Sequence, residues 1–323
     1  MGTGLLFHQR KDDGAQWVTS STNRIFMSPF KGKKMFPKDS RLHAFREDLA
    51  DKRLEGEVTA KRFVQGEKRR VNVPVAGLFK ENNKKSEMQT ECLLGEELLI
   101  FEQGESMSWG QSLKDGYVGY IDTKALCTST VKQTHIVSAP RTFQYFQADL
   151  RGPVEYSLSI GSKVSVVSEV ETRGTKYSIL DSGSAVVSNH LSPIDHVAYK
   201  DYVTVAENLV HTPYLWGGAS GFGIDCSGLV QLSMMMAGHV VLRDTDMQQK
   251  TIGNPLSESD ELQRGDLVFW KGHVAIMVDR KNIIHANGSS MDVTVEPLEE
   301  ATTRIAQKCQ RYPIERRRPA LGI

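Results

Sequence analysis

The sequence predicts a multidomain protein in which two all-β modules precede a domain of mixed α+β structure. Three observations support this order. The chain has 323 residues, which is too many for one ordinary hydrophobic core. Short β-type runs, separated by polar and Gly/Asn turns, fill the segment from residue 58 to residue 193. Beyond residue 193, a helical apolar period, a buried helix and a set of strands follow in turn.

We divide the chain into four parts on this basis. Residues 1–57 contain few apolar and many charged side chains, so we expect a tail and an extended approach, with one short helix in 41–54 packed along another domain. Residues 58–130 form the first β module, and residues 131–193 form the second. Residues 194–323 form the α+β domain.

The two β modules are similar in length and form the internal repeat of the chain. In the first module we expect strands at residues 57–64, 70–75, 97–102, 107–112 and 117–121. In the second we expect strands at residues 134–138, 157–160, 163–168, 176–180 and 183–187, with 188–193 closing the module. In the last domain a helix is expected over 199–210, because an apolar helical period runs to Pro213.

The charge balance and the apolar runs exclude some classes of partner. A formal net charge of +1 gives no broad basic field for nucleic acid, and we interpret the basic cluster at residues 316–318 as a solvated tail. No stretch approaches the roughly 18 to 20 apolar residues of a membrane span, so no membrane insertion is expected. The N-terminus also lacks a secretory apolar region, which predicts a cytoplasmic protein. A periplasmic or secreted protein requires that a signal has been removed.

One of the four cysteines stands in a pattern typical of a nucleophile. The cysteines at 92, 127, 226 and 309 are scattered, which argues against a zinc ribbon or a disulfide scaffold. A glycine-rich run over 217–223 leads into Asp225-Cys226-Ser227-Gly228 and then into a buried helix. Cys226 therefore lies at a helix N-terminus, where the helix dipole and the unpaired N–H groups favour the thiolate. We interpret the other three cysteines as packing residues.

Two histidines can supply the base that such a nucleophile needs. Residues 266–270 and 273–278 read as strands, residues 279–282 as a turn, and the next strand begins at 283. If the last two strands pair as a hairpin, His273 and His285 point to one face, directly or diagonally opposite each other. We expect Cys226 as nucleophile, His273 as general base and acid, and His285 as the group that orients His273.

Four ordered motifs in the last third of the chain resemble the NlpC family of papain-like cell-wall peptidases. They are Asp-Cys-Ser-Gly-Leu-Val-Gln at 225–231, Arg-Gly-Asp-Leu-Val-Phe-Trp at 264–270, Gly-His-Val-Ala-Ile-Met at 272–277 and Ile-His-Ala-Asn at 284–287. Segments around Leu94, Trp109 and Asp115–Ile121 resemble a bacterial SH3-like domain. The fold class implied is two all-β SH3-like barrels followed by an α+β papain-like catalytic domain.

The resemblance also implies which residues contact a substrate. Tyr214 is expected to line the site and assist the oxyanion together with the backbone N–H of Cys226, whereas Trp216 is interpreted as structural. In relatives that act on free stem peptides, the first barrel lies against the active site and closes the pocket around the free amine. The substrate contacts expected on this basis are Asp225, Ser227, Asp244, Thr245, Tyr117 and an acid that is either Glu87 or Glu91.

The resemblance implies a cysteine peptidase that cuts the γ-D-glutamyl to diamino-acid bond of murein peptides with a free N-terminal L-Ala, in cell-wall recycling. The partner is the murein peptide, and no metal or organic cofactor is implied. Three alternatives stay open. They are a secreted hydrolase acting on intact peptidoglycan, a wall-ligand binding protein without catalysis, and a related acyltransferase.

Overall fold

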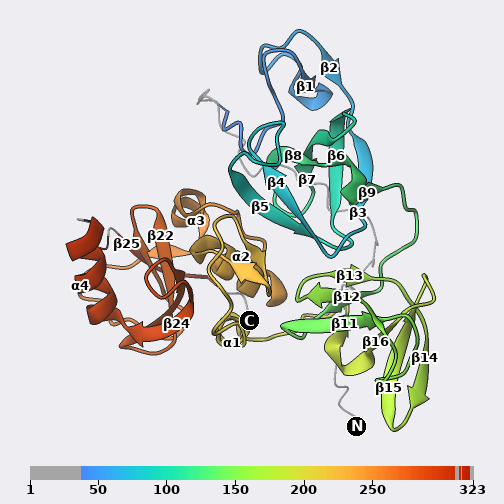
Figure 1. The fold of residues 1–323 in the computed structure, drawn as a ribbon. Helices are drawn as coiled ribbons and strands as arrows, with labels where there is room; N and C mark the ends of the chain where they lie inside the picture. The colour runs from blue at the N-terminus through green and yellow to red at the C-terminus, as the bar shows by residue number, and fades with distance from the viewer. Residues whose placement is uncertain (1–37, 310–312, 314, 321–323) are drawn as a thin grey trace, which may run out of the picture. The chain divides into compact units, whose positions relative to one another are not determined.

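The computed structural model describes residues 38–309, 313 and 315–320, except for the side chains of residues 308 and 309. The expected tail at residues 1–37 lies outside this description. From Lys38 onward the chain forms one unit by its contacts. Within this unit, two β modules precede a domain of mixed helices and strands (Figure 1). None of the helices in the described part of the chain is long and apolar enough to cross a bilayer.

The helix expected over residues 41–54 is wrong. This segment contains β1 (Ala50–Asp51) and the 3₁₀ turn η1 (Lys52–Leu54), and β1 pairs in parallel with β2 (Phe63–Val64). Ala44 and Leu49 are both buried against Phe101 and Trp109 of the first module. Residues five apart point about 140° away from each other on a helix, so a helix would separate these two apolar groups. A turn brings both onto the same side.

The first β module is one seven-stranded sheet in the order β5-β4-β8-β7-β6-β3-β9. Its strands are β3 (Glu67–Val71), β4 (Val75–Phe79), β5 (Met88–Leu93), β6 (Glu97–Gln103), β7 (Met107–Ser112), β8 (Val118–Asp122) and β9 (Leu126–Cys127), with η2 (Thr123–Ala125) before the last. The strands expected at 97–102 and 107–112 are confirmed, but of 57–64 only the last two residues are extended.

The sequence prediction missed β4 and β5. The four residues Thr90–Leu93 of β5 are all buried, because one face of the strand joins the module's core and the other faces the last domain. A strand covered on both faces lacks the alternation that marks a strand in sequence. Cys92 is part of this core, which confirms its role as a packing residue.

The second β module contains a three-stranded and a five-stranded sheet, in the orders β13-β10-β17 and β12-β11-β16-β15-β14. Its elements are β10 (His135–Val137), β11 (Arg141–Tyr145), β12 (Val154–Ser159), β13 (Lys163–Val164), β14 (Val166–Thr172), β15 (Thr175–Leu180), β16 (Ala185–Val187), η3 (Ser188–His190) and β17 (Leu191–Pro193). Each expected strand is present at least in part, while β11 was not predicted.

The last domain is built around a six-stranded antiparallel sheet in the order β20-β25-β21-β22-β23-β24. The strands are β20 (Asn254–Pro255), β21 (Leu267–Trp270), β22 (His273–Met277), β23 (Asn282–Asn287), β24 (Asp292–Pro297) and β25 (Glu315–Arg318), and a separate hairpin joins β18 (Ala219–Ser220) to β19 (Gly223–Ile224). The helices are α1 (Tyr202–Glu207), α2 (Cys226–Met236), α3 (Thr245–Thr251) and α4 (Leu298–Cys309).

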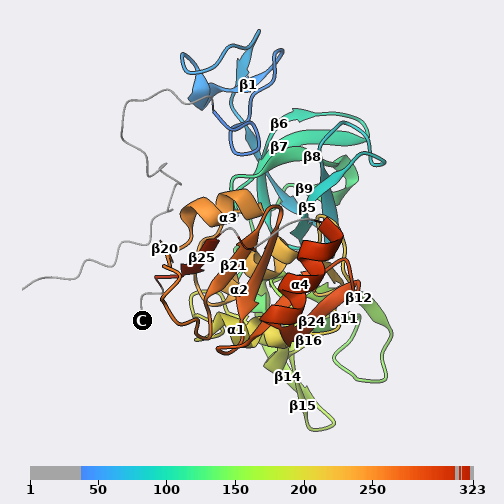
Figure 2. The same cartoon turned by 90° about the vertical axis from the view of Figure 1, so that its left-hand side faces the viewer.

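Helices cover both faces of this sheet (Figure 2). Helices α1 and α2 pack on the face that carries Phe269, Ile276 and Ile284. Helix α4 packs through Ala301 on the face that carries Trp270 and Met277. The expected α+β arrangement is therefore confirmed, with the nucleophile helix buried against the sheet.

The basic cluster at the C-terminus is not a solvated tail. Residues 316–318 belong to β25, which pairs with both β20 and β21. Arg317 donates to the backbone carbonyls of Ile252 and Gly253, and Arg318 donates to Asp266 at 2.8 Å. The charges are thus held by acceptors from neighbouring segments, a tertiary pairing that composition alone does not reveal.

Candidate active site

Cys226 is the first residue of α2, as the sequence predicted. Asp225 caps the helix, because its Oδ1 accepts the backbone N–H of Gly228 at 2.7 Å. The preceding loop lies directly on the helix, and a Cβ at Gly228 would lie 2.3 Å from the carbonyl oxygen of Gly218. A glycine is therefore required at this position if the loop is to hold the nucleophile in place.

The resting state of Cys226 differs from the expectation. Burial and the carboxylate of Asp225 raise the pKa of the Cys226 thiol to about 11. The backbone N–H of Val274, the hydroxyl of Thr245 and the charge of Arg243 act in the opposite direction but do not offset burial. The thiol is therefore protonated at neutral pH, and its activation needs a base.

The two histidines lie on the predicted hairpin. The register pairs Ile276 with Ile284, so His273 and His285 are diagonal neighbours on one face of β22 and β23. Nε2 of His273 is 2.8 Å from Nδ1 of His285. Val274, the neighbour of His273, places its N–H against the thiol of Cys226, so the start of β22 adjoins the nucleophile.

A carboxylate and a guanidinium beyond His285 were missed by the sequence analysis. Nε2 of His285 is 2.6 Å from Oε1 of Glu296 on β24, and Arg304 of α4 pairs with the same carboxylate. Burial opposes the ionisation of Glu296, but hydrogen bonds from His285 and Arg304 outweigh it and lower the pKa of Glu296 to about 2. Only the register of β23 with β24 makes Glu296 the diagonal neighbour of His285, so no sequence motif marks it.

Cys226 opens into a pocket of about 350 Å³. Its walls come from the N-terminal segment, the first β module and four segments of the last domain. They contain Arg41, Glu87, Gln89, Tyr117, Tyr214, Trp216, Gly217, Asp225, Cys226, Ser227, Arg243, Asp244, Thr245, Asp246, Gln249, Lys271 and Gly272. Of the expected substrate contacts, Glu91 alone is missing from these walls.

Tyr214, Trp216 and Glu91 lie in three different environments. Burial raises the pKa of Tyr214 to about 12, so its hydroxyl is a hydrogen-bond donor at neutral pH. Trp216 lines the pocket and is 61% exposed, which contradicts the interpretation of this residue as structural packing. Glu91 is buried and accepts the N–H of Ala219 at 2.9 Å, which directs it to the glycine-rich loop.

Asp225 and Ser227 are engaged by a buried arginine that the sequence analysis did not nominate. Arg243 is 1% exposed, and it donates to both oxygens of Asp225 at 2.9 and 2.7 Å and to Oγ of Ser227 at 2.8 Å. It also donates to Thr90 of the first module. A buried charge is expected to be paired in this way. Both carboxylate oxygens of Asp225 are therefore engaged by Arg243.

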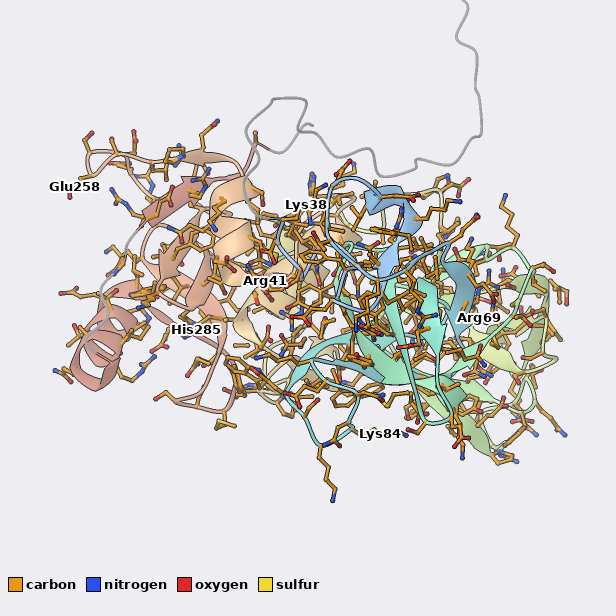
Figure 3. The ribbon with its side chains drawn as sticks, turned by 90° about the horizontal axis from the view of Figure 1, so that it is seen from above. Lys38, Arg41, Arg69, Lys84, Glu258 and His285 are labelled. Carbon is orange, nitrogen blue, oxygen red and sulfur yellow. The ribbon has the colours of Figure 1, made fainter. Side chains whose placement is uncertain are left out.

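Asp244 and Thr245, at the start of α3, lie between the nucleophile and the first module. Oγ1 of Thr245 is 4.0 Å from Sγ of Cys226. Oδ2 of Asp244 accepts from the hydroxyl of Tyr117 at 3.0 Å and from Nη1 of Arg41 at 2.7 Å. Arg41 lies in the N-terminal segment (Figure 3), so this carboxylate joins three parts of the chain.

The remaining cysteines stand apart from this site. Cys127 is half-buried in β9, and no disulfide involves Cys92, Cys127 or Cys226. The side chain of Cys309 lies outside the described residues.

Comparison with known proteins agrees with this fold. The NlpC/P60 family model matches residues 211–310, and the model of the bacterial dipeptidyl-peptidase Sh3 domain matches residues 78–126. The chain belongs to the NlpC/P60 family, as a peptidase with an SH3-like domain before its catalytic domain.

Its similarity to individual relatives extends well beyond the catalytic domain. A gamma-D-glutamyl-L-lysine dipeptidyl-peptidase of Bacillus subtilis (strain 168) is 30% identical over 234 residues, which are 66% of this chain and 77% of the relative. Dipeptidyl-peptidase 6 of Lysinibacillus sphaericus is 28% identical over 246 residues, which are 70% and 90% of the two chains. The crystal structure of an NlpC/P60 family protein from Bacillus cereus ATCC 10987 shares the fold, with a TM-score of 0.65, 19% identity, and coverage of 79% of this chain and all of that one.

Proposed function

We propose that this peptidase cuts the γ-D-glutamyl to diamino-acid bond of murein stem peptides that carry a free N-terminal L-Ala, in cell-wall recycling. The diamino acid is diaminopimelate or lysine. One observation carries the proposal. Tyr117 of the first module bonds to Asp244 in the wall of the pocket that contains Cys226. A carboxylate in the pocket wall is suited to an ammonium, and we infer that the first module, which contacts this carboxylate, leaves little space for an upstream chain. The names of the Bacillus relatives support the same bond class.

The reaction needs a nucleophile, a group that acts as both base and acid, and two donors that stabilise the oxyanion. His273 accepts the proton of the Cys226 thiol as the sulfur attacks the γ-carbonyl, and the oxyanion is stabilised by the N–H of Cys226 and the hydroxyl of Tyr214. His273 then protonates the leaving amine, which releases the diamino acid and leaves an acyl-enzyme. Water, deprotonated by His273, attacks the acyl carbon and releases L-Ala-γ-D-Glu and the thiol. Proton transfer must precede or accompany attack, because the Cys226 thiol rests protonated.

Asp244 is the group we propose for the amine of L-Ala. Its Oδ2 already accepts from Tyr117 and Arg41, whereas its Oδ1 has no hydrogen-bond partner among the described residues. Burial raises the pKa of Asp244, and a substrate ammonium would restore the preference for the charged carboxylate. Between the two acids expected from the first module, Glu87 lines the pocket and Glu91 does not, so we propose Glu87 as the second acid.

The test compares hydrolysis of L-Ala-γ-D-Glu-diaminopimelate with that of the same peptide N-acetylated. We expect wild type to cleave the free peptide at least about tenfold faster, and Cys226→Ala to cleave neither. Asp244→Asn should lower kcat/KM for the free peptide about 10- to 100-fold, the scale of a lost charged hydrogen bond. Asp246→Asn is the matched control, since Asp246 also pairs with Arg41 but is more exposed.

Each other outcome selects an alternative. Equal cleavage of the free and acetylated peptides would overturn the closed amine pocket and favour a hydrolase acting on intact peptidoglycan. Binding of both peptides without cleavage would favour a wall-ligand binding protein. Product that forms only when an amine acceptor is added would favour an acyltransferase.

A further inference from the structure

The hydrogen bonds at the active site continue from His285 to the carboxylate of Glu296 on β24 and from there to the guanidinium of Arg304 on α4. We propose that Glu296, held in place by Arg304, is a positioning residue. It fixes the ring tautomers of His285 and His273, so that Nδ1 of His273 is unprotonated and can accept the thiol proton. The inference rests on the proposed roles of Cys226, His273 and His285. It assigns a function to residues that no motif in the chain marks.

The direction of each hydrogen bond follows from Glu296. An ionised carboxylate can only accept, so Nε2 of His285, at 2.6 Å, must carry a proton. In a neutral imidazole the other nitrogen is then an acceptor, so Nδ1 of His285 accepts the Nε2–H of His273 at 2.8 Å. That leaves Nδ1 of a neutral His273 without a proton. The ring is thereby set as a base before substrate arrives.

Among the described residues, Asn287 is the other hydrogen-bond neighbour of Nε2 of His285, and it cannot replace Glu296 in this role. Nδ2 of Asn287 lies 3.3 Å from Nε2 of His285. An amide N–H₂ group is a donor, so it favours the opposite tautomer, in which Nε2 of His285 carries no proton. Oδ1 of Asn287 accepts the backbone N–H groups of Ser289 and Ser290 at 2.8 and 3.0 Å. His285 is only 1% exposed, so bulk water is not a substitute either.

Two elements, β24 and α4, fix the position of the Glu296 carboxylate. The register of β23 with β24 places Glu296 diagonal to His285 on the sheet face that α4 covers. Arg304 of α4 pairs with the carboxylate from the other side, and the side chain of Glu296 is 15% exposed. A bidentate guanidinium orients a carboxylate as well as neutralising it.

The charged and titratable groups around the two histidines are four side chains from three elements. They are Cys226 at the start of α2, Glu296 on β24, Arg304 on α4, and Glu300 of α4, whose charge acts on Arg304. Of these, the Glu296 carboxylate contacts His285 directly and stabilises a positive charge on the histidine pair. Replacing Glu296 by a neutral group should therefore favour the neutral pair and extend activity toward lower pH.

The experiment measures the pH profiles of kcat and KM for Glu296→Gln and for Glu299→Gln, with the L-Ala-γ-D-Glu-diaminopimelate peptide. Glu299 is an exposed acid at the start of α4 and serves as the matched control. For Glu296→Gln we expect kcat to fall about 10- to 100-fold, part of the range of general acid–base catalysis. We expect KM to change by less than about twofold and the acidic limb of kcat to move to lower pH. Glu299→Gln should match wild type.

A second readout does not depend on substrate or on activity. Imidazole ¹⁵N resonances of wild type should show His285 and His273 each protonated at Nε2, and Glu296→Gln should show a mixture of tautomers for His285. Arg304→Lys, which keeps a charge but loses the bidentate fork, should give an intermediate kcat. It serves as the second variant if Glu296→Gln folds poorly.

Three results would overturn the inference. One is a wild-type His285 protonated at Nδ1, and another is an unchanged His285 tautomer in Glu296→Gln. The third is a loss of kcat in Glu296→Gln without any movement of the acidic limb, which indicates a merely structural role. If wild type cleaves no peptide at all, the proposed function fails, while the ¹⁵N spectra still decide the role of Glu296.

Discussion

Cys226 illustrates how opposing local effects set the reactivity of one residue. Its place at the start of α2 favours the thiolate. Its burial and the capping carboxylate of Asp225 favour the thiol and prevail, which gives a pKa of about 11. The residue that caps the helix thus adds to the effect of burial, which is the larger cause of the raised pKa of the thiol. A base that acts during the reaction resolves this conflict, and His273 is the candidate.

We predict that the alkylation of Cys226 by iodoacetamide rises about tenfold per pH unit between pH 7 and pH 10. The sign follows from the raised pKa, because the reactive thiolate fraction grows with pH until the pKa is reached. The rate is measured by mass spectrometry of the modified peptide. Cys226→Ala supplies the background from the other three cysteines. A fast, pH-independent rate from pH 6 upward would show instead that the thiolate is already formed in the free enzyme.

At the scale of elements, Arg243 joins the glycine-rich loop to the nucleophile helix. It donates to Asp225 and Ser227 at the start of α2 and to the carbonyl of Gly218 in the loop. The residue follows α2 and is fully enclosed. A long cation is needed here because the helix cap Asp225 is itself buried and must be neutralised.

We predict that Arg243→Met lowers the free energy of unfolding by about 3 to 5 kcal/mol, the cost of leaving a buried carboxylate without its partner. Arg264→Met is the matched control. Arg264 also pairs with two acids, Asp201 and Glu207, but its side chain is 39% exposed. We therefore expect a loss of about 1 kcal/mol or less for this variant. Urea denaturation followed by tryptophan fluorescence measures both, and equal losses would contradict the special role of Arg243.

At the scale of the whole molecule, both β modules hold the loop that precedes Cys226. Glu91 of the first module accepts the N–H of Ala219 at 2.9 Å, and Ser159 of the second accepts the N–H of Gly221 at 2.8 Å. Arg141 of the second module donates to the carbonyl of Gly221 at 2.8 Å. The loop is therefore fixed by residues far away in the sequence, and the modules contribute to the geometry of the site.

We predict that Ser159→Ala lowers kcat/KM about fivefold, since one hydrogen bond of about 1 kcal/mol no longer fixes the loop. Ser162→Ala is the matched control in the same turn. Its Oγ is buried and has no hydrogen-bond partner among the described residues, so its removal costs no hydrogen bond. Steady-state kinetics with the free tripeptide compares the two variants. A similar loss in both, or none in either, would show that the second module does not act on the loop.

Local sequence determined those parts of the protein in which neighbouring residues decide the structure. The strands at 97–102 and 107–112 alternate clearly and are present. The nucleophile helix starts at Cys226 because the cap, the glycines and the apolar run are contiguous. The hairpin that pairs β22 with β23 follows from a turn and a period of two. The family model matches residues 211–310, the part of the chain that contains the same short, ordered motifs.

Tertiary structure alone decided the features that depend on contacts between distant segments. Strand β5 is covered on both faces, so its burial has no period to detect. Residues 316–318 became an internal strand because β20 and β21 supply partners. Glu296, Arg304 and Arg243 reach the site through strand register and helix packing, and Arg41 reaches Asp244 across 203 positions. Charged side chains carry no periodic signal of their own, and their partners are fixed only when the chain has folded.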